Sequence, residues 1–323
     1  MRIMAILLAA ALACTASQAL AGPHDGRWIA EIPPQTVPCN GTSVMRVIVV
    51  DETIMGEVHT PWGHNSFNGK IDADGSGTFT FGRDGGTIKF GGDHFDANWS
   101  NARCGLRHAL GDREPSDAQK EQMAAERKQR QDRFAALVAS AEAGDKGTDY
   151  TVLRANYPYT ESWDPYGNRT AGLLQQAQAA QKGGDCPTAL DKLDQVIKLD
   201  FTIDGAHALR ADCLVGQKAA AESAIADGLI HSLMNSGDGA SEKTAYVVVS
   251  MREEMDVLAN RHIQTKTHET GVRGSDGHYY DQVEGISLKD GAKAKTLFFD
   301  VSAFTAGRLS RDAEIATVAG TIH

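Results

Sequence analysis

The segment TAGLLQQAQAAQKGGDCPTALDKLDQVIKL, residues Thr170–Leu199, decides how this chain folds. Its apolar residues recur at the 3.6-residue spacing of an amphipathic helix on both sides of the turn Gly183-Gly184-Asp185. Pro187 follows the turn at a first-turn position, where its missing N–H costs no hydrogen bond. The segment therefore predicts two helices joined by a tight turn. Its apolar residues are Leu173, Leu174, Ala177, Ala180, Ala189, Leu190, Leu193, Val196, Ile197 and Leu199.

A second helix pair, Gly205–Met234, repeats the first. Gly216 repeats Gly184 and Ala221 repeats Ala189, each at an offset of 32 residues (216 − 184 and 221 − 189). This offset is close to the tetratricopeptide period of about 34 residues. A single hairpin of this kind cannot bury its apolar face alone and must pack against neighbouring elements. We therefore predict tetratricopeptide-like helical hairpins inside a larger domain.

The hydrophobic period changes after Asn235–Gly239. Apolar and β-branched runs then alternate with turn residues, which predicts strands, while Glu253–Leu258 is typical of a short helix. Helices followed by strands predict a mixed α+β domain over residues 148–311 with a small antiparallel sheet, and a tail at 312–323. The predicted strands are Ala245–Ser250, Arg261–Thr267, Gly277–Val283 and Ala294–Val301.

The N-terminal half has a period of two instead. Between Asp25 and Gly111, short runs alternate apolar and polar residues and are separated by Gly, Asn and Asp. We predict a small all-β module over residues 22–111, either an antiparallel barrel or a sandwich. Within it, Asp72–Gly77 is typical of a hairpin turn, because the glutamate that closes an EF-hand calcium loop is absent.

A charged helix is predicted between the two domains, in a spacer covering residues 112–147. Ser116 is a candidate N-cap after Pro115. The half from Gln119 to Arg133 mixes both signs of charge with few apolar residues, which is typical of a solvated helix. Phe134, Leu137, Val138 and Ala141 then recur at helical spacing, as expected of a face that docks on a domain.

The N-terminus predicts export. Arg2 precedes the apolar run Ile3–Ala13, and Ala19-Leu20-Ala21 has the small-x-small pattern of a cleavage site. Residues 1–21 are therefore predicted to be a secretory signal peptide, cleaved after Ala21, and the protein to be periplasmic or secreted.

A lipoprotein anchor is the alternative. Ala11-Leu12-Ala13-Cys14 resembles a lipobox, in which Cys14 would be lipidated and hold the protein at the bacterial envelope. Lipoboxes favour leucine where this chain has Ala11, so soluble export is preferred. No later segment is long and apolar enough to cross a membrane, so membrane contact would depend on Cys14 alone.

Four cysteines remain after the predicted cleavage, in a compartment where cysteines usually pair. Cys39 and Cys104 bracket the β module, while Cys186 and Cys213 both fall in the helical part. Of the three pairings that four cysteines allow, we therefore predict Cys39–Cys104 and Cys186–Cys213. Metal binding by these cysteines is less favoured, because no Cys-x-x-Cys spacing occurs.

The charge excludes some classes of partner. A formal net charge of −10 argues against general affinity for nucleic acid or anionic lipid, which requires clustered Lys and Arg. It is consistent with a protein that stays dispersed in solution.

Two stretches carry family resemblances. Asp25-Gly26-Arg27-Trp28 at the start of the β module, with Trp99 and Cys104-Gly105 at its end, resembles a small β module of exported proteobacterial proteins. Separated motifs in the C-terminal half resemble domain-of-unknown-function family 4919, a family of bacterial exported domains. That resemblance implies homology over about half of the chain but no reaction. Its motifs are Asp149 with Leu153-Arg154, Asp164–Gly167, Gly237–Gly239 with Thr244–Val248, His278–Asp281 and Leu297–Val301.

Candidate catalytic residues lie in the loop 237–244 and in the last predicted strands. A hydrolytic interpretation takes His278 or His262 as general base, Asp281 as its orienting partner and Ser241 as nucleophile. Because Ser241 lies in no nucleophile elbow, the alternative is that Asp238 and Ser241 cap backbone N–H groups while His278 and Asp281 pair across a strand end. The candidates are Asp238, Ser241, Thr244, His278 and Asp281.

Ligand and metal sites have weaker signals. The aromatic loop Tyr157–Gly167 is more often a packed lid than a ligand platform, and its candidate binding residues are Tyr159, Trp163 and Tyr166. His262, His268 and His278 lack the i, i+4 pairing of zinc helices, so neither a metal nor a cofactor is predicted.

Two functional classes follow. The helical repeat, the modular β domain and the lack of a catalytic motif favour a non-enzymatic interaction or scaffolding protein with an envelope protein or peptide partner. The alternative is an envelope hydrolase that uses the 237–244 loop with His278. A third interpretation places a small apolar ligand inside the β module.

Overall fold

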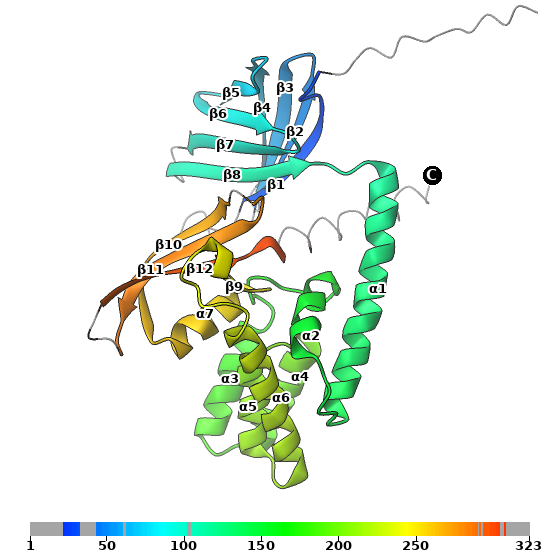
Figure 1. The fold of residues 1–323 in the computed structure, drawn as a ribbon, viewed down its shortest axis with the longest axis vertical. Coiled ribbons are helices and arrows are strands. Elements are labelled where there is room, and N and C mark those ends of the chain that lie inside the picture. Colours follow the sequence, from blue (N-terminus) through cyan, green and yellow to red (C-terminus); the bar gives the residue numbers. More distant parts are fainter. Residues whose placement is uncertain are drawn as a thin grey trace, which may run out of the picture. The chain divides into compact units, whose positions relative to one another are not determined.

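The computed structural model describes residues 22–32, 43–60, 63–101, 105–274, 276–289, 291, 293–303 and 307. The chain divides into two compact units, one ending at Glu114 and one beginning at Pro115 (Figure 1). The predicted signal peptide with Cys14, the predicted Cys39–Cys104 pair and the tail at 312–323 lie outside the described residues.

The first unit is a closed barrel of eight antiparallel strands. Each strand pairs with the next, and β1 also pairs with β8, where Trp28 lies opposite Arg113. The predicted barrel or sandwich is therefore a barrel, and closure removes the exposed strand edges that a sandwich would have. The strands are β1 (Gly26–Ile32), β2 (Ser43–Val50), β3 (Thr53–Thr60), β4 (Gly63–Ile71), β5 (Ser76–Phe81), β6 (Asp84–Gly91), β7 (His94–Asn101) and β8 (Gly105–Arg113).

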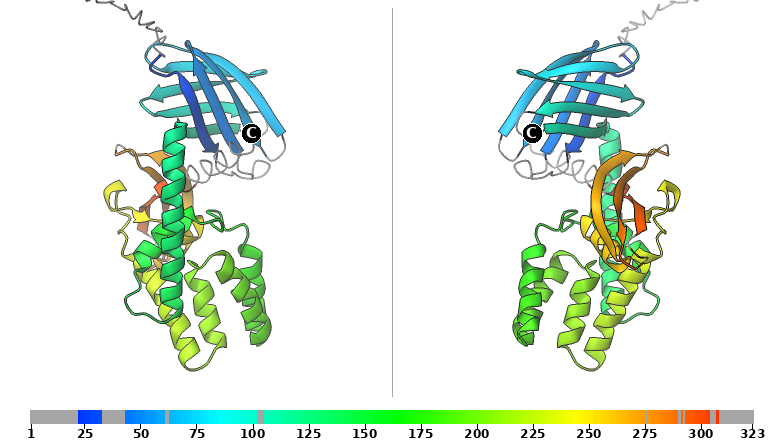
Figure 2. Two further views of the ribbon diagram at one scale, coloured as in Figure 1. Left: turned by 90° about the vertical axis from the view of Figure 1, so that its right-hand side faces the viewer. Right: turned by 90° about the vertical axis from the view of Figure 1, so that its left-hand side faces the viewer.

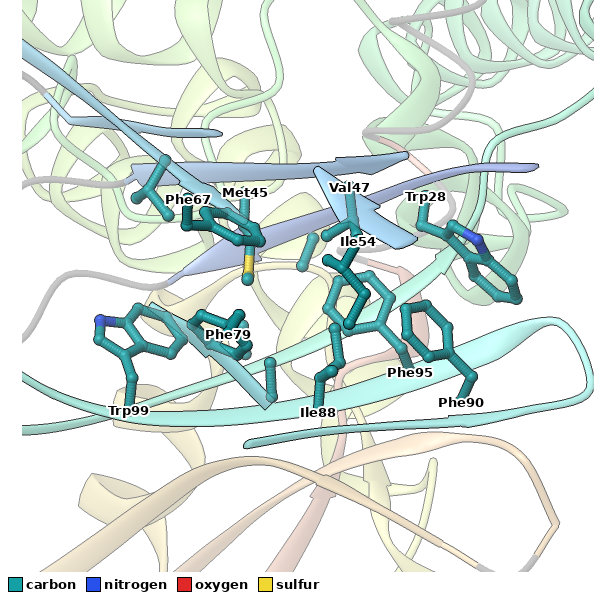
Figure 3. Close-up of a cluster of buried hydrophobic side chains, with 14 of the residues drawn as sticks. Trp28, Met45, Val47, Ile54, Phe67, Phe79, Ile88, Phe90, Phe95 and Trp99 are labelled. Carbon is teal, nitrogen blue, oxygen red and sulfur yellow. The ribbon is translucent and has the colours of Figure 1, made fainter. Parts of the chain in front are cut away.

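Apolar side chains fill the barrel interior. The period of two in the sequence sends alternate residues inward, and Figure 3 shows the labelled rings and aliphatic chains pointing toward one another. Trp28 packs edge to face on Phe90, with 4.9 Å between the ring centroids. Gly111 makes room for the ring of Phe95, since a Cβ at Gly111 would lie 2.1 Å from Phe95 Cε1. This packing counts against an apolar ligand inside the barrel.

The predicted hairpin turn at Asp72–Gly77 is confirmed. β4 and β5 pair across it, with Ile71 opposite Gly77. The Asp74 carboxylate accepts hydrogen bonds from the backbone N–H of Ser76 at 2.9 Å and from Lys89 Nζ at 2.9 Å. These hydrogen bonds, the Ser76 backbone bond foremost, lower the pKa of Asp74 to about 2. The carboxylate is thus engaged by its own turn and by the neighbouring strand.

Helix α1 (Asp117–Glu142) opens the second unit with the predicted cap. The Ser116 side chain accepts from the N–H of Gln119, whose side chain accepts in turn from the N–H of Ser116, which is a capping box. The half expected to be solvated differs from the prediction, because Arg127 is buried and its Nε donates to the Tyr159 carbonyl at 3.0 Å. The sequence pattern predicts that the Arg127 charge is solvated. In the structure the carbonyl of Tyr159, a residue far along the chain, accepts its hydrogen bond instead.

The second unit continues with α2 (Tyr150–Asn156), the 3₁₀ turn η1 (Tyr157–Tyr159), α3 (Ala171–Lys182), α4 (Cys186–Leu199), α5 (Asp204–Cys213) and α6 (Gln217–Met234). Helices α3 to α6 occupy the predicted segments, whereas α2 and the 3₁₀ turn η1 were not predicted. The stripe read from the sequence is buried: Leu174, Ala177, Leu193 and Val196 form one core with α2, α5 and α6. The left-hand view of Figure 2 shows α1 running alongside this helical group. Their tetratricopeptide-like character stays a prediction.

The predicted Cys186–Cys213 disulfide is present. Cys186 is the first residue of α4 and Cys213 the last of α5. Their Cα atoms are 5.3 Å apart, within the usual range for a disulfide. The bond therefore joins the second helix of the first hairpin, just after its turn, to the end of the first helix of the next.

A four-stranded sheet follows the helices, in the order β10-β11-β12-β9. Its strands are β9 (Tyr246–Val247), β10 (Ile263–Arg273), β11 (Tyr279–Ser287) and β12 (Lys293–Asp300), with α7 (Met251–Asn260) between β9 and β10. The right-hand view of Figure 2 shows β10 and β11 as a curved pair.

The predicted strand Ala245–Ser250 differs most from the structure. Only Tyr246 and Val247 pair, and they run parallel to β12, so the sheet is not purely antiparallel. The run ends early because the Ser250 side chain accepts a hydrogen bond from the N–H of Glu253 and caps α7. Val248 and Val249 are buried all the same. The apolar run therefore predicts correctly that these residues are buried, but buried residues need not pair in a strand.

A buried ion pair joins the helical group to α7. Arg154 in α2 contacts Glu253 through two hydrogen bonds of 2.7 Å, from Nε to Oε1 and from Nη2 to Oε2. Both side chains are almost fully buried, at 4 % and 5 % exposure. Arg154 Nη2 also donates to the Val247 carbonyl, and Glu253 accepts from the N–H of Val249. The pair thus holds α2, α7 and the β9 segment together.

Candidate functional site

The loop 237–244 is a folded turn bound to β12. The N–H of Asp238 donates to the Thr244 carbonyl at 3.0 Å, and the Asp238 carboxylate accepts from the N–H of Ala240 at 2.9 Å. Hydrogen bonds from Thr244 and Ala240 lower the pKa of Asp238. The carbonyl of Gly239 accepts from the N–H of Phe298, which fixes the loop to the sheet. Asp238 therefore has the backbone-capping role considered from the sequence.

Among the described residues, Ser241 has no general base as its hydrogen-bond partner. Its Oγ lies 3.2 Å from Oγ1 of Thr244, so two candidate residues bind each other. His278 is engaged elsewhere: its Nδ1 lies 2.8 Å from Oδ2 of Asp300, and this hydrogen bond raises the pKa of His278. The expected pairing of His278 with Asp281 is therefore wrong. Asp300 lies opposite Tyr280 in the sheet register, and this places it, rather than Asp281, beside the strand end.

Asp281 faces the other way and meets His268 and Glu254. Oδ2 of Asp281 lies 3.3 Å from Nε2 of His268, and Oε2 of Glu254 lies 3.2 Å from the same nitrogen. The three residues come from β11, β10 and α7, and their ligand atoms lie within 4.8 Å of one another. We call these residues the Glu254–His268–Asp281 cluster. In the described part of the chain it is the one group of three that could hold a metal ion.

The cluster combines deep burial with one open side. Glu254 is 1 % exposed and the side chain of Asp281 5 %, whereas 30 % of the His268 side chain is exposed. The contact of Glu254 with His268 lacks hydrogen-bond geometry, so neither Glu254 oxygen has a hydrogen-bond partner among the described residues. Burial raises the pKa of Glu254 to about 7. Contact with Asp281, and next with Glu254, raises the pKa of His268 to about 10.

Sequence reasoning missed Glu254, although a signal for it exists. Glu253 and Glu254 share the i, i+3, i+4 face of α7 with Val257 and Leu258, and all four are buried, whereas Met255 is 58 % exposed. A carboxylate on the apolar face of a short helix must find a cation or a proton. The metal interpretation of the sequence groups His268 with His262 and His278, and neither of those belongs to the cluster.

The aromatic loop is mostly committed to packing. Trp163 is buried, and its Nε1 donates to the Val249 carbonyl at 2.9 Å. The ring of Tyr159 lies under the guanidinium of Arg130, 4.5 Å from its centroid. Tyr166 is half-buried. All three candidate binding residues are therefore engaged within the chain.

A surface groove of about 360 Å³ lies between α1 and α4. Phe134, Val138 and Glu142 line one side of it, spaced four residues apart on one face of α1. Ile197 and Phe201 line the other side. The lining is therefore partly apolar and partly charged, with charges of both signs at Glu142, Asp194, Lys198 and Arg210.

A second acidic group is formed by Asp256, two residues after Glu254 on α7, and Asp204 at the start of α5. Burial, and next the nearby charge of Asp204, raises the pKa of Asp256 to about 7 in spite of the Arg252 guanidinium, whose Nε lies 3.3 Å from Asp256 Oδ1. Burial raises the pKa of Asp204 as well. The raised pKa values of Asp204 and Asp256 make the free energy of unfolding depend on pH.

We expect the Asp256→Asn variant to be more stable than the parent at pH 8 and nearly equal to it at pH 4. Since the folded pKa of Asp256 is raised, its stabilising contribution is complete below the unfolded value of about 3.9 and is lost as the pH rises through about 7. The gain in unfolding free energy at pH 8 should be on the order of 1–2 kcal/mol. It is limited because Asp204 carries part of the cost of the buried negative charge. Urea unfolding at both pH values measures it. The exposed Glu161→Gln variant is the control, and an equal gain at both pH values would contradict the assignment.

No protein-family model, curated protein or solved structure matches this chain. The family resemblances drawn from the sequence therefore stay predictions.

Proposed function

We propose that this protein is an exported, non-enzymatic binding protein that holds an extended peptide segment of an envelope partner in the groove between α1 and α4. The groove itself is the observation that carries the proposal. The export signal at residues 1–21 and the resemblance to domain-of-unknown-function family 4919 are part of it. The Cys186–Cys213 disulfide is consistent with a non-reducing compartment, and none of the described helices has the length and hydropathy of a membrane span.

The shape of the groove favours a peptide. Phe134 and Glu142 are eight residues apart on α1, which is about 12 Å at 1.5 Å per residue. This length matches three to four residues of extended chain at about 3.3 Å each. Two helix faces form its walls, and amphipathic grooves of this kind receive apolar anchor side chains.

The chemistry of the groove restricts the partner. Phe134, Val138, Ile197 and Phe201 provide an apolar seat for one large side chain. At the rim Arg210 is already paired, with Asp194 at 3.1 Å and Glu222 at 2.8 Å. Lys198 is exposed and has no ion-pair partner among the described residues. A peptide with an apolar anchor close to an acidic residue therefore fits best.

The hydrolase alternative has less support. Ser241 is bound to Thr244 and His278 to Asp300, while Asp281 belongs to the Glu254–His268–Asp281 cluster. A nucleophile needs its general base within hydrogen-bond reach, and these candidates are held by different partners.

Selection of displayed random peptides on the immobilised mature chain tests the proposal. We expect enrichment of peptides with an apolar residue next to Asp or Glu, bound with micromolar affinity. The Val138→Lys variant, which places a charge in the apolar seat, should lose this binding by at least about tenfold. Lys198→Glu should change the selected charge from acidic to basic.

The matched control is Ala136→Lys, which adds the same charge at an exposed position of α1. It should select the same peptides as the parent. Absence of an enriched motif, or equal binding by Val138→Lys, would overturn the proposal.

A further inference from the structure

We propose that the Glu254–His268–Asp281 cluster binds a divalent transition-metal ion, with Zn²⁺ as the best fit. The inference is independent of the peptide groove, since the residues of the cluster do not line it. Three different elements provide the ligands, one histidine nitrogen and two carboxylates.

The distances from His268 Nε2 to the two carboxylates are those of ligands around one ion. Zn²⁺ binds histidine nitrogen and carboxylate oxygen at about 2.0–2.2 Å in tetrahedral geometry, which places neighbouring ligand atoms about 3.3–3.5 Å apart. Nε2 of His268 lies 3.2 Å from the Glu254 oxygen and 3.3 Å from the Asp281 oxygen. Both carboxylates thus converge on the same ring nitrogen at the separation that shared coordination requires.

Two other histidine–carboxylate pairs of the second unit are shorter, although in the barrel His108 Nε2 lies 3.1 Å from Asp96 Oδ1. Nδ1 of His207 lies 2.7 Å from Glu222, and Nδ1 of His278 lies 2.8 Å from Asp300. These are normal lengths for charge-assisted hydrogen bonds. The two contacts of His268 are about half an ångström longer, and the one with Glu254 lacks hydrogen-bond geometry.

Glu254 has the strongest need for a ligand. It is 1 % exposed, and both of its oxygens lack a hydrogen-bond partner among the described residues. A buried carboxylate without a hydrogen bond is costly, and a bound cation would satisfy it. The backbone that carries Glu254 is also held in place, because the preceding residue, Glu253, is fixed by Arg154 and the helix start is capped by Ser250.

The donor set selects the type of metal. Calcium takes six to eight oxygen ligands, and magnesium keeps several waters with one or two carboxylates. One imidazole with two carboxylates fits zinc better, with a fourth position left for water. The partly exposed ring of His268 provides the route of entry from solvent.

Zinc titration of the full mature chain tests the site. After treatment with EDTA and dialysis, the protein is titrated with Zn²⁺ against a chromophoric chelator. We expect one tight site per chain and a rise in Tm on adding zinc, since a ligand that binds only the folded state stabilises it. His268→Ala and Asp281→Asn should each weaken binding by at least about tenfold. His278→Ala, which removes a histidine from the same sheet, should not.

Titration of the parent protein decides the matter even if a variant fails to fold. Binding of Co²⁺ by the parent, with the visible absorption of a four-coordinate site that zinc displaces, would support the proposal independently. No stoichiometric zinc in the parent would mean that His268 is an imidazolium held between two carboxylates, and would overturn it. Equal binding by His268→Ala would assign the zinc to another place and also overturn it.

Discussion

The Arg154→Met variant is expected to lose about 3–5 kcal/mol of unfolding free energy, the largest effect of any single substitution considered for this protein. Arg154 and Glu253 are 4 % and 5 % exposed and share two hydrogen bonds of 2.7 Å. Removing the guanidinium leaves a buried carboxylate with one remaining donor, the N–H of Val249. The cost is therefore that of an uncompensated buried charge as well as that of the lost contact.

Urea unfolding followed by the helical far-UV circular dichroism signal measures this loss, because the described helices all belong to the second unit. The control is Lys128→Met, which breaks an exposed i, i+4 pair with Asp132 and should cost no more than about 0.5 kcal/mol. The double variant Arg154→Met with Glu253→Met should recover part of the loss, since it leaves no unpaired charge. A double variant less stable than either single one would contradict this explanation.

Removing the Cys186–Cys213 bond has the second largest expected effect. The cysteines are 27 residues apart, and the loop-entropy relation gives about 3.5 kcal/mol for a loop of that length. The variant with both cysteines replaced by serine should therefore unfold at markedly lower urea concentration. Because the bond joins α4 to α5, the helical signal should report the change.

Reductant provides the matched control for the disulfide. The parent in reductant should behave like the double serine variant, and the variant itself should not respond in its helical signal. Cys213→Ser alone should lose as much as the double variant if the bond, and not the side chains, is the source. A loss below about 1 kcal/mol in every case would contradict the loop-entropy explanation.

The helical part was predictable because its signals are local. The 3.6-residue stripe between Leu173 and Leu199, the Gly183-Gly184 turn and Pro187 determine α3 and α4 from neighbours within a few residues. The capping box at Ser116 is local in the same way. The Cys186–Cys213 pairing followed from the helix ends, once the order of the helices was known.

The candidate sites were not predictable to the same degree, because partners are assigned by strand register. Asp281 and His268 were both recognised as candidates, but β10 shifts register twice, between Thr265 and Thr267 and between Glu269 and Val272. These irregularities, which a period-two pattern does not reveal, place His268 beside Asp281. His278 lies beside Asp300 instead. The groove likewise depends on where α1 docks. The sequence predicts a docking face on α1 but does not show which residues it contacts.

The sequence alone determined the classes and approximate positions of most elements: a β module with inward-facing alternate residues, a capped charged helix, two helix pairs and a final sheet. Those follow from side-chain periodicity and caps, which act over a few residues. Only the tertiary structure decided that the β module closes, that Ala245–Ser250 pairs over two residues, and that Glu254 meets His268 and Asp281. Each of these depends on contacts between residues far apart in the chain, where packing and register outweigh local preference.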